Sequence, residues 1–351
     1  MTRTRSRPPP ILPTVLLALA ALVSSPARAV DLGERFELHG YGDLAHTVAN
    51  VDATGERLGA RETSHNLSLV GIWQATDRTR VWGQLFRSSE LGKVRVDWAF
   101  ADYHAGSGQT WRAGRVRMPF GLHNESRDVQ ALRPSASMPF LYDEELALVD
   151  EAFDGASVEQ RIALGRGSAT IEVYAAQQLL SGGPQSARGA ALGARVGIET
   201  PIDGLSFRLS GYAGRLRPDG ADERAAKRGW AASARYVRDA IDLQAEVARG
   251  RLYERSVSTW YLQGALELSE RWQAVTRLEH ITTDTARRGE DAFGERRLIA
   301  GLAWRISPNF GLRLEQQFHR GHAMAVLHET LEEGEGRHRW TSTVLSANYQ
   351  F

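Results

Sequence analysis

Basic and acidic side chains are concentrated between residues 95 and 145, and their types permit electrostatic rather than covalent chemistry. The basic members are Arg95, Arg112, Arg115, Arg117, Arg127 and Arg133, and the acidic members are Asp128, Asp143, Glu144 and Glu145. Opposed groups of this kind, held across a narrow aqueous passage, would create a transverse field that orders water and filters solutes by charge and size. We therefore treat these residues as candidate lining groups of a pore constriction.

Residues for metal binding or catalysis are present, but their spacing does not favour either chemistry. The chain has ten His and no Cys. No compact ligand pattern such as His-Glu-x-x-His occurs, and there is no Gly-x-Ser-x-Gly elbow around a nucleophile. His65 and His123 each stand near a serine, a proximity that arises easily by chance. We expect no metal, no other cofactor and no enzymatic activity.

The elements that must position the charged groups are expected to be long amphipathic strands. Alternation with a period of two places successive side chains on opposite faces of a sheet. The clearest example sets Val94, Val96, Trp98 and Phe100 on one face and Arg95, Asp97, Ala99 and Ala101 on the other. The rhythm recurs along the chain up to the final residue, Phe351, which ends an alternating run of Leu345, Ala347 and Tyr349. A run of this kind is typical of the closing strand of an outer-membrane barrel.

Sixteen segments show a strand-like pattern, and each reaches the roughly 9–11 residues that a tilted membrane strand needs. They lie near 35–49, 63–75, 79–89, 93–104, 109–118, 154–164, 168–179, 187–200, 204–216, 226–238, 241–252, 256–268, 271–284, 295–307, 309–322 and 338–351. Every second connection is short, while most of the others are longer and more polar. The sequence therefore predicts an all-β fold, a transmembrane antiparallel β-barrel of about sixteen strands.

The first 29 residues have the pattern of a secretory signal peptide. Arg3, Arg5 and Arg7 precede an apolar stretch at 11–23, and Ala27-Arg28-Ala29 offers a small-x-small cleavage site. We expect cleavage before Val30, leaving 30–351 as the barrel in the outer membrane of a Gram-negative bacterium. With 43 Lys and Arg against 42 Asp and Glu, the charge balance argues against a nucleic-acid partner.

The longest connection, 119–153, follows a stretch that resembles a known family. The matching residues are Gly114, Arg115, Arg117, Pro119, Phe120, Gly121, Leu122, Ser126, Arg127, Asp128, Arg133 and Pro134. They resemble the third-loop entry of the phosphate-selective porin O/P group within the Gram-negative outer-membrane porins. The resemblance implies that this third external loop folds into the lumen and constricts it, and it favours a homotrimer. The alternative is a solvated loop that lies outside the barrel.

Strand parity predicts a nearly balanced set of inward charges. Eight are basic and nine acidic: Arg95, Arg112, Arg208, Arg235, Arg277, Arg297, Arg305 and Arg313 against Glu37, Asp43, Asp97, Glu172, Asp242, Glu246, Glu267, Glu279 and Glu315. We expect a passive aqueous channel for ions and small hydrophilic solutes, in contact with outer-membrane lipid. An anion- or phosphate-selective porin is one alternative, and a non-conducting structural or adhesin barrel is another.

Overall fold

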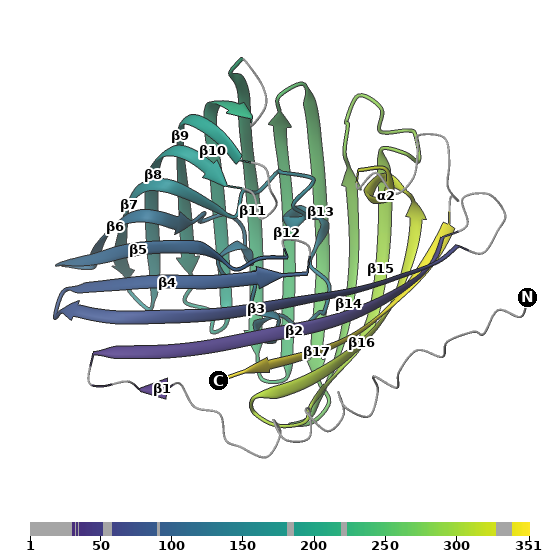
Figure 1. Ribbon diagram of the computed structural model, residues 1–351, viewed down its shortest axis with the longest axis horizontal. Coiled ribbons are helices and arrows are strands. Elements are labelled where there is room, and N and C mark those ends of the chain that lie inside the picture. The colour runs from purple at the N-terminus through teal and green to yellow at the C-terminus, as the bar shows by residue number, and fades with distance from the viewer. Residues whose placement is uncertain are drawn as a thin grey trace, which may run out of the picture.

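A single continuous antiparallel sheet dominates the computed structural model, which describes residues 30–31, 33, 35–51, 58–89, 92–180, 186–218, 223–327 and 339–351 (Figure 1). Its strands, β1 to β17, are Val30–Asp31, Phe36–Val51, Leu58–Thr76, Thr79–Ser88, Arg95–Gly106, Gln109–Arg117, Ala152–Leu164, Gly167–Leu180, Ser186–Glu199, Leu205–Pro218, Ala225–Arg238, Ile241–Leu252, Arg255–Glu267, Trp272–Thr282, Gly294–Arg305, Phe310–Gly321 and Arg339–Gln350. Three short 3-10 helices lie between β6 and β7: η1 (Asn124–Ser126), η2 (Gln130–Leu132) and η3 (Phe140–Tyr142). One short helix, α2 (Ala323–Leu327), follows β16.

The sheet closes on itself as a barrel. Each strand from β2 to β17 pairs antiparallel with the next, and β17 pairs with β2, where Leu345 lies opposite His46. The two-residue β1 adds a short pairing to the start of β2 and does not take part in this closure. The prediction of a sixteen-stranded antiparallel barrel is confirmed. Closure is what lipid requires, because an open sheet edge would leave backbone N–H and C=O groups unpaired in hydrocarbon.

The predicted signal peptide, residues 1–29, lies outside the described residues. Among the described residues, no helix has the length and apolar character needed to cross a bilayer.

Outward positions carry the large apolar side chains, as the alternation predicts. Leu44, Leu67, Leu243, Leu262 and Leu314 come from different strands and are between 42% and 54% exposed. Polar residues of the opposite parity, such as Gln244 and Gln263, are buried within the barrel. An apolar exterior with a polar interior is the arrangement that a membrane barrel requires.

One stretch of β5 departs from the expected alternation. The pairing of β4 with β5 shifts between Gln84, which faces Trp98, and Leu85, which faces Val96, so Asp97 is an extra residue. Both Asp97 and Trp98 are consequently buried. The prediction that Trp98 and Phe100 share the outward face of Val96 is therefore wrong, because a bulge of one residue reverses the phase of the strand beyond it.

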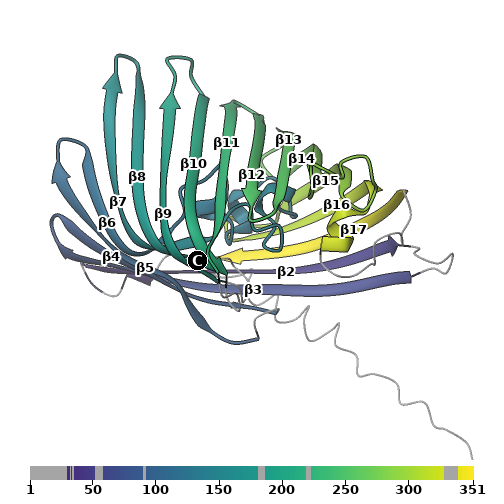
Figure 2. The same cartoon turned by 90° about the horizontal axis from the view of Figure 1, so that it is seen from above.

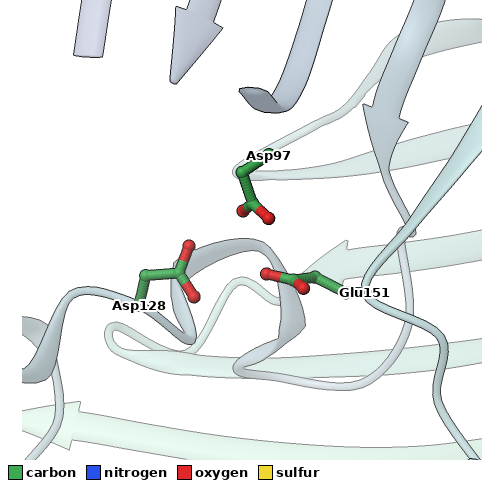
Figure 3. Close-up of side chains that lie close together, drawn as sticks. All are labelled: Asp97, Asp128 and Glu151. Carbon is green, nitrogen blue, oxygen red and sulfur yellow. The ribbon is translucent and has the colours of Figure 1, made fainter. Parts of the chain in front are cut away.

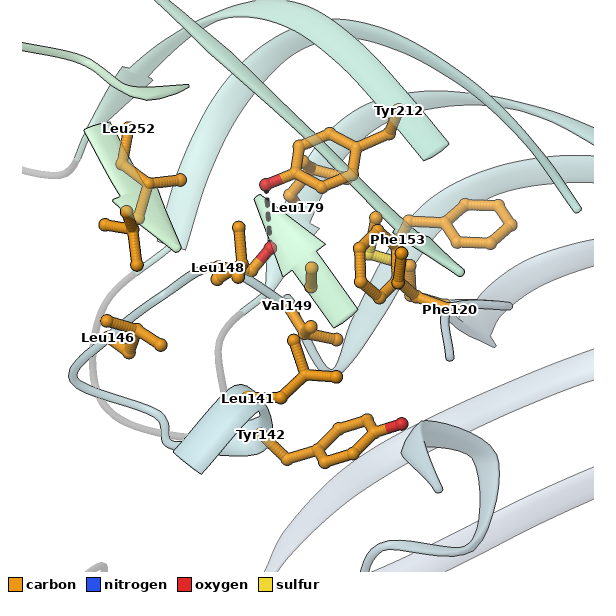
Figure 4. Close-up of a cluster of buried hydrophobic side chains, with 14 of the residues drawn as sticks. Phe120, Leu141, Tyr142, Leu146, Leu148, Val149, Phe153, Leu179, Tyr212 and Leu252 are labelled. Atoms are coloured by element: carbon orange, nitrogen blue, oxygen red, sulfur yellow. Dashed lines mark hydrogen bonds between the residues drawn. The ribbon is translucent and has the colours of Figure 1, made fainter. Parts of the chain in front are cut away.

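The segment 118–151, which connects β6 to β7, runs inside the curve of the sheet (Figure 2). Its apolar residues pack on strand residues in a buried cluster that includes Phe120, Leu141, Leu146, Leu148, Leu179, Tyr212 and Leu252 (Figure 4). The Tyr212 hydroxyl also donates a hydrogen bond of 2.9 Å to the Leu148 carbonyl. The barrel interior thus contains a small apolar core built by the loop, in addition to its polar wall.

Candidate functional site

Three carboxylates, of Asp97, Asp128 and Glu151, lie close together at the base of the inserted segment (Figure 3). An arginine at the end of β6 pairs with all three. Arg117 lies 3.1 Å from Asp97 and 2.7 Å from Glu151, and it also pairs with Asp128. Arg95 pairs with the first two acids at 2.7 and 3.2 Å. The three carboxylates are close enough to hold a cation, but the Arg117 guanidinium already fills that role. The cluster therefore ties residue 128 of the loop to β5 and β6.

Arg112 is held against the wall in a similar way. Its guanidinium lies 2.7 Å from Asp102 and 3.6 Å from Glu172, and it covers the ring of Phe100 at 5.0 Å. About a fifth of the side chain remains exposed, as for Arg95. These two predicted lining residues therefore face the barrel interior and retain contact with solvent.

Three buried glutamates on alternate strands of the far wall hold the inserted segment in place. Glu246 on β12 accepts bonds from the Tyr142 hydroxyl at 2.7 Å and from the Leu122 amide at 3.1 Å. Glu279 on β14 accepts the Phe140 amide at 2.8 Å. Charged acceptors make the stronger class of hydrogen bonds. These acids, expected to be charges along the wall, are used instead as acceptors for the loop.

The third of these glutamates is Glu315 on β16. It accepts hydrogen bonds from the hydroxyls of Ser135 at 2.6 Å and Ser137 at 2.7 Å, and from the amide of Ala136. It is 1% exposed. The segment therefore crosses the lumen from its β5–β6 base to the β16 wall, with attachments on both sides.

The second half of the loop carries the remaining predicted acids. Arg127 is buried and reaches Glu144 at 3.3 Å and the Tyr142 carbonyl at 2.9 Å. Asp143 accepts the amides of Glu145 and Leu146, each at 3.1 Å, which stabilises a turn. All three acids of 143–145 are half-buried, so they remain at the solvent boundary of the loop.

Arg115 does not share this environment. In the sheet register it stands opposite Ala99 and Asp154, on the same parity as Trp111, whose partner Tyr103 is exposed. Its guanidinium pairs with Asp154 at 2.9 Å. The prediction that Arg115 lines a constriction is therefore corrected, because the strand parity places this ion pair on the outward face of the barrel.

Arg133 is the predicted residue whose charge is least compensated. It is 8% exposed, and its Nε and Nη1 have no hydrogen-bond partner among the described residues. Burial lowers the pKa of Arg133 to about 10, and the nearby Arg313 and Arg277 act in the same direction against Asp43. Arg313 donates to the backbone carbonyl of Arg133 at 3.0 Å, so the Arg313 side chain reaches the loop at residue 133.

A cavity of about 250 Å³ lies next to Arg133 at the short-turn end of the barrel. Its walls come from the loop at 131–134, from β11, β12 and β14–β17, and from the turn 307–309. Its charged lining consists of Arg133, Arg235, Arg271, Arg305, Arg313 and Asp242. Asp242 is bound to Arg235 at 2.8 Å, so the acid of this lining is already paired.

Sequence reasoning missed several residues that hold the loop. Arg195 pairs with Glu172 at 2.9 Å and with Glu125 of the loop. On β9, Arg195 has the opposite parity to Leu192 and Ile198, whose side chains are exposed on the outer face. Strand alternation alone would therefore have placed Arg195 inward. Lys227 binds Asp150 at 2.6 Å, with both side chains 3% exposed. No local signal could have paired those two, because their contact depends on the return path of the loop.

Comparison with known proteins supports the fold. No family model matches the chain, and no curated protein matches it. Among solved structures, the outer membrane channel DcaP of Acinetobacter baumannii has a TM-score of 0.59 at 12% identity and covers 93% of this chain and 100% of its own. The anion-selective porin from Comamonas acidovorans has a TM-score of 0.63 at 13% identity, with 90% and 99% covered. OmpF of Salmonella typhi has 0.61 at 14%, with 92% and 100% covered. The chain thus has the fold of Gram-negative outer-membrane porins.

Proposed function

We propose that the chain is an outer-membrane porin that lets ions and small hydrophilic solutes diffuse passively, through a lumen that segment 118–151 narrows. The observation that carries the proposal is the attachment of this segment to Glu246, Glu279 and Glu315 on the wall opposite its base. A loop fixed on both sides restricts the cross-section without closing off the solvated arginines on β5 and β6. Polar and charged lining groups with an apolar exterior are what an aqueous membrane passage needs.

The proposed selectivity is mainly by size. Charges near the loop occur largely as pairs, so each cancels much of the field of its partner at a distance. Arg112 with Asp102 and Arg127 with Glu144 are examples. Small neutral solutes should therefore pass, with a permeation rate that falls as their size rises.

Liposome swelling tests the proposal against the reading of a non-conducting structural or adhesin barrel. Proteoliposomes with the folded full chain are placed in iso-osmotic solutions of a mono-, a di- and a trisaccharide. We expect swelling that is fastest with the smallest sugar. Absence of swelling above empty liposomes, for protein shown to be folded by its altered gel mobility without heating, would refute passive diffusion.

The outward ion pair also favours association with further copies of the chain, and we propose a homotrimer. The side chains of Arg115 and Asp154 are 35% and 25% exposed. The same outer face also carries exposed apolar and aromatic side chains: Val94, Val96, Tyr103 and Trp111. Charged groups on a lipid-facing surface are costly near the middle of the bilayer. A neighbouring subunit over this face would remove them from lipid.

Oligomeric state in mild detergent tests the trimer. Light scattering of the purified protein should give three copies per particle. Ala99 and Ala113 lie beside the ion pair of Arg115 and Asp154. Replacing both alanines by tryptophan should shift the particles towards monomers, while Ala274→Trp on β14 should not. A monomeric wild-type protein would contradict the proposal.

A further inference from the structure

Six arginines lie on the outer face of the barrel at its loop end, which is the end where segment 118–151 begins. They are Arg188 on β9, Arg215 and Arg217 on β10, Arg228 on β11, and Arg249 and Arg251 on β12. Each has the strand parity of exposed apolar residues such as Leu209 and Val247, and each is itself exposed. We call this set the arginine belt.

The strand register places members of the arginine belt beside one another. Arg188 lies directly opposite Arg217, and Arg228 lies directly opposite Arg251. Like charges in such cross-strand positions repel each other. None of the six forms an ion pair in the part of the chain that the structure describes, although the turn after β12 contains an exposed acid, Glu254. The belt is therefore a concentration of positive charge without an acidic partner among the described residues.

The arginine belt lies where the apolar outer surface of the barrel ends. On β12 the outward side chains change from Leu243 and Val247, which are exposed and apolar, to Arg249. Trp230 lies directly opposite Arg249 and is 44% exposed. Outward tryptophan is typical of the boundary between hydrocarbon and water in membrane proteins. The belt therefore borders the lipid headgroups rather than the hydrocarbon.

The opposite ends of the same strands combine arginine with acid. Arg238, the exposed arginine at the short turn after β11, pairs with Asp239 at 3.8 Å. Short turns face the periplasm in outer-membrane barrels, and the longer loops face the exterior. The uncompensated positive charge of β9–β12 thus lies at the end of the barrel that meets the outer leaflet.

We propose that the arginine belt binds the phosphorylated headgroup of the glycolipid that forms the outer leaflet of the outer membrane. This headgroup carries phosphates on adjoining sugars, so one lipid presents several negative charges to neighbouring arginines. The planar fork of a guanidinium matches the oxygens of a phosphate in geometry and in charge. Bound headgroups would neutralise the belt and fix the depth of β9–β12 in the membrane. This role of the outer surface goes beyond the proposed channel function.

Native mass spectrometry of the folded full chain in a neutral detergent tests the proposal. The probe is lipid A with both phosphates, and the reference is the same lipid without phosphate. The wild type should bind the phosphorylated form about tenfold more tightly or better. R228Q/R251Q removes two opposed arginines, so the dissociation constant should rise about 25-fold, about fivefold for each charge at an anionic lipid surface. Equal affinity for the two forms of the lipid would overturn the proposal.

The matched control is R166Q/R238Q, which removes two exposed arginines at short turns. The apolar band that separates these turns from the belt is about 25 Å tall, well beyond a Debye length of about 10 Å. The affinity of this variant for phosphorylated lipid A should stay within about twofold of the wild type. Equal losses in the two double variants would mean general charge attraction and would overturn the belt as a site.

Two further measurements exclude other occupants of the arginine belt. Phosphatidylglycerol, with one phosphate in each headgroup, should bind more weakly than phosphorylated lipid A, and equal affinity would overturn the glycolipid as the occupant. Light scattering should give the same particle mass for R228Q/R251Q and the wild type, whereas dissociation of the variant would make the belt an interface between copies. Should R228Q/R251Q not fold, R215Q/R249Q removes the same charge from β10 and β12, and the same rise is expected. Because binding is measured in detergent, its result does not depend on whether the protein conducts.

Discussion

Two buried arginines of the same loop region, Arg117 and Arg133, are almost equally enclosed yet have opposite surroundings. Arg117 meets three carboxylates within hydrogen-bonding distance, while Arg133 has two nitrogens without a partner in the described structure. Their relative exposures are 7% and 8%, so burial alone does not distinguish them. The difference lies in compensation: three carboxylates surround Arg117, whereas no ion pair in the described structure neutralises Arg133.

The substitution Arg117→Met should have the largest effect on this comparison. It leaves three clustered acids with Arg95 as their remaining partner, and Asp128 loses its ion pair altogether. Breaking a buried ion pair costs about 3–5 kcal/mol. We expect the free energy of unfolding in urea, measured in lipid vesicles, to fall by that amount. Arg238→Met breaks the exposed pair with Asp239 at the short turn after β11 and should cost far less, because exposed ion pairs contribute little to stability. Equal losses in both variants would contradict the assignment of Arg117 as the attachment of the loop.

Acid pH should weaken the loop through His123. Burial lowers the pKa of His123 to about 4, although its Nε2 lies 2.8 Å from the Gln244 side-chain oxygen. The unfolded chain, with the ordinary value of 6.5, takes up the proton first, so stability present above pH 6.5 is lost as the pH falls towards 4. The loss should reach about 3 kcal/mol at most.

Unfolding free energies between pH 7 and pH 4 measure this dependence. His123→Gln should flatten the pH curve. His46→Gln, which changes an exposed histidine beside Thr63, should leave it unchanged. If the unfolding free energy of His123→Gln still fell with pH as steeply as that of the wild type, another group would cause the pH dependence.

Removing the charge of a wall glutamate should have a moderate effect. Glu315→Gln replaces one carboxylate oxygen by an NH2 group, which cannot accept, so one of the donors from Ser135 to Ser137 loses its partner. Leaving a buried donor unsatisfied costs about 1–3 kcal/mol. We expect this loss in unfolding free energy together with larger current fluctuations in the open channel. Glu267→Gln, at the partly exposed pair with Arg305, is the control and should cost less than about 1 kcal/mol.

Arg133→Met should have the smallest effect on stability, and it gives the clearest contrast between Arg133 and Arg117. It removes a buried charge that has little compensation, so the free energy of unfolding should stay within about 1 kcal/mol of the wild type or increase. The measurement is the same urea unfolding used for Arg117→Met. A loss as large as that of Arg117→Met would mean that structural partners compensate the charge of Arg133.

Most of the fold could be predicted from the sequence, because alternation with period two is a local signal. Segments such as 109–118 and 241–252 match their strands within a residue. The alternation was wrong where a bulge intervenes, since the extra residue Asp97 has no signature in the sequence. The strand 63–75 was too short, because Leu58–Thr76 continues beyond the apolar pattern.

The candidate site could be predicted only in part. Sequence pattern located the charges, but Arg115 was assigned to the constriction although the parity that places Arg112 inward places Arg115 outward, as the register of β6 shows. The partners of Arg117 and Glu315 depend on where a loop of more than thirty residues crosses the lumen. Contacts between residues as distant in sequence as Ser135 and Glu315 leave no periodic signal. Composition likewise could not show that the inward acids would be used by the loop.

Single-channel conductance in planar bilayers tests the central claim most directly. The full chain should give discrete, ohmic current steps, and a variant that lacks residues 123–150 should give larger steps, because the segment that crosses the lumen is gone. Both proteins are first shown to be folded by their gel mobility without heating. Steps of unchanged size in the folded deletion variant would contradict the constriction, and a folded full-length protein that gives no steps would contradict the channel itself.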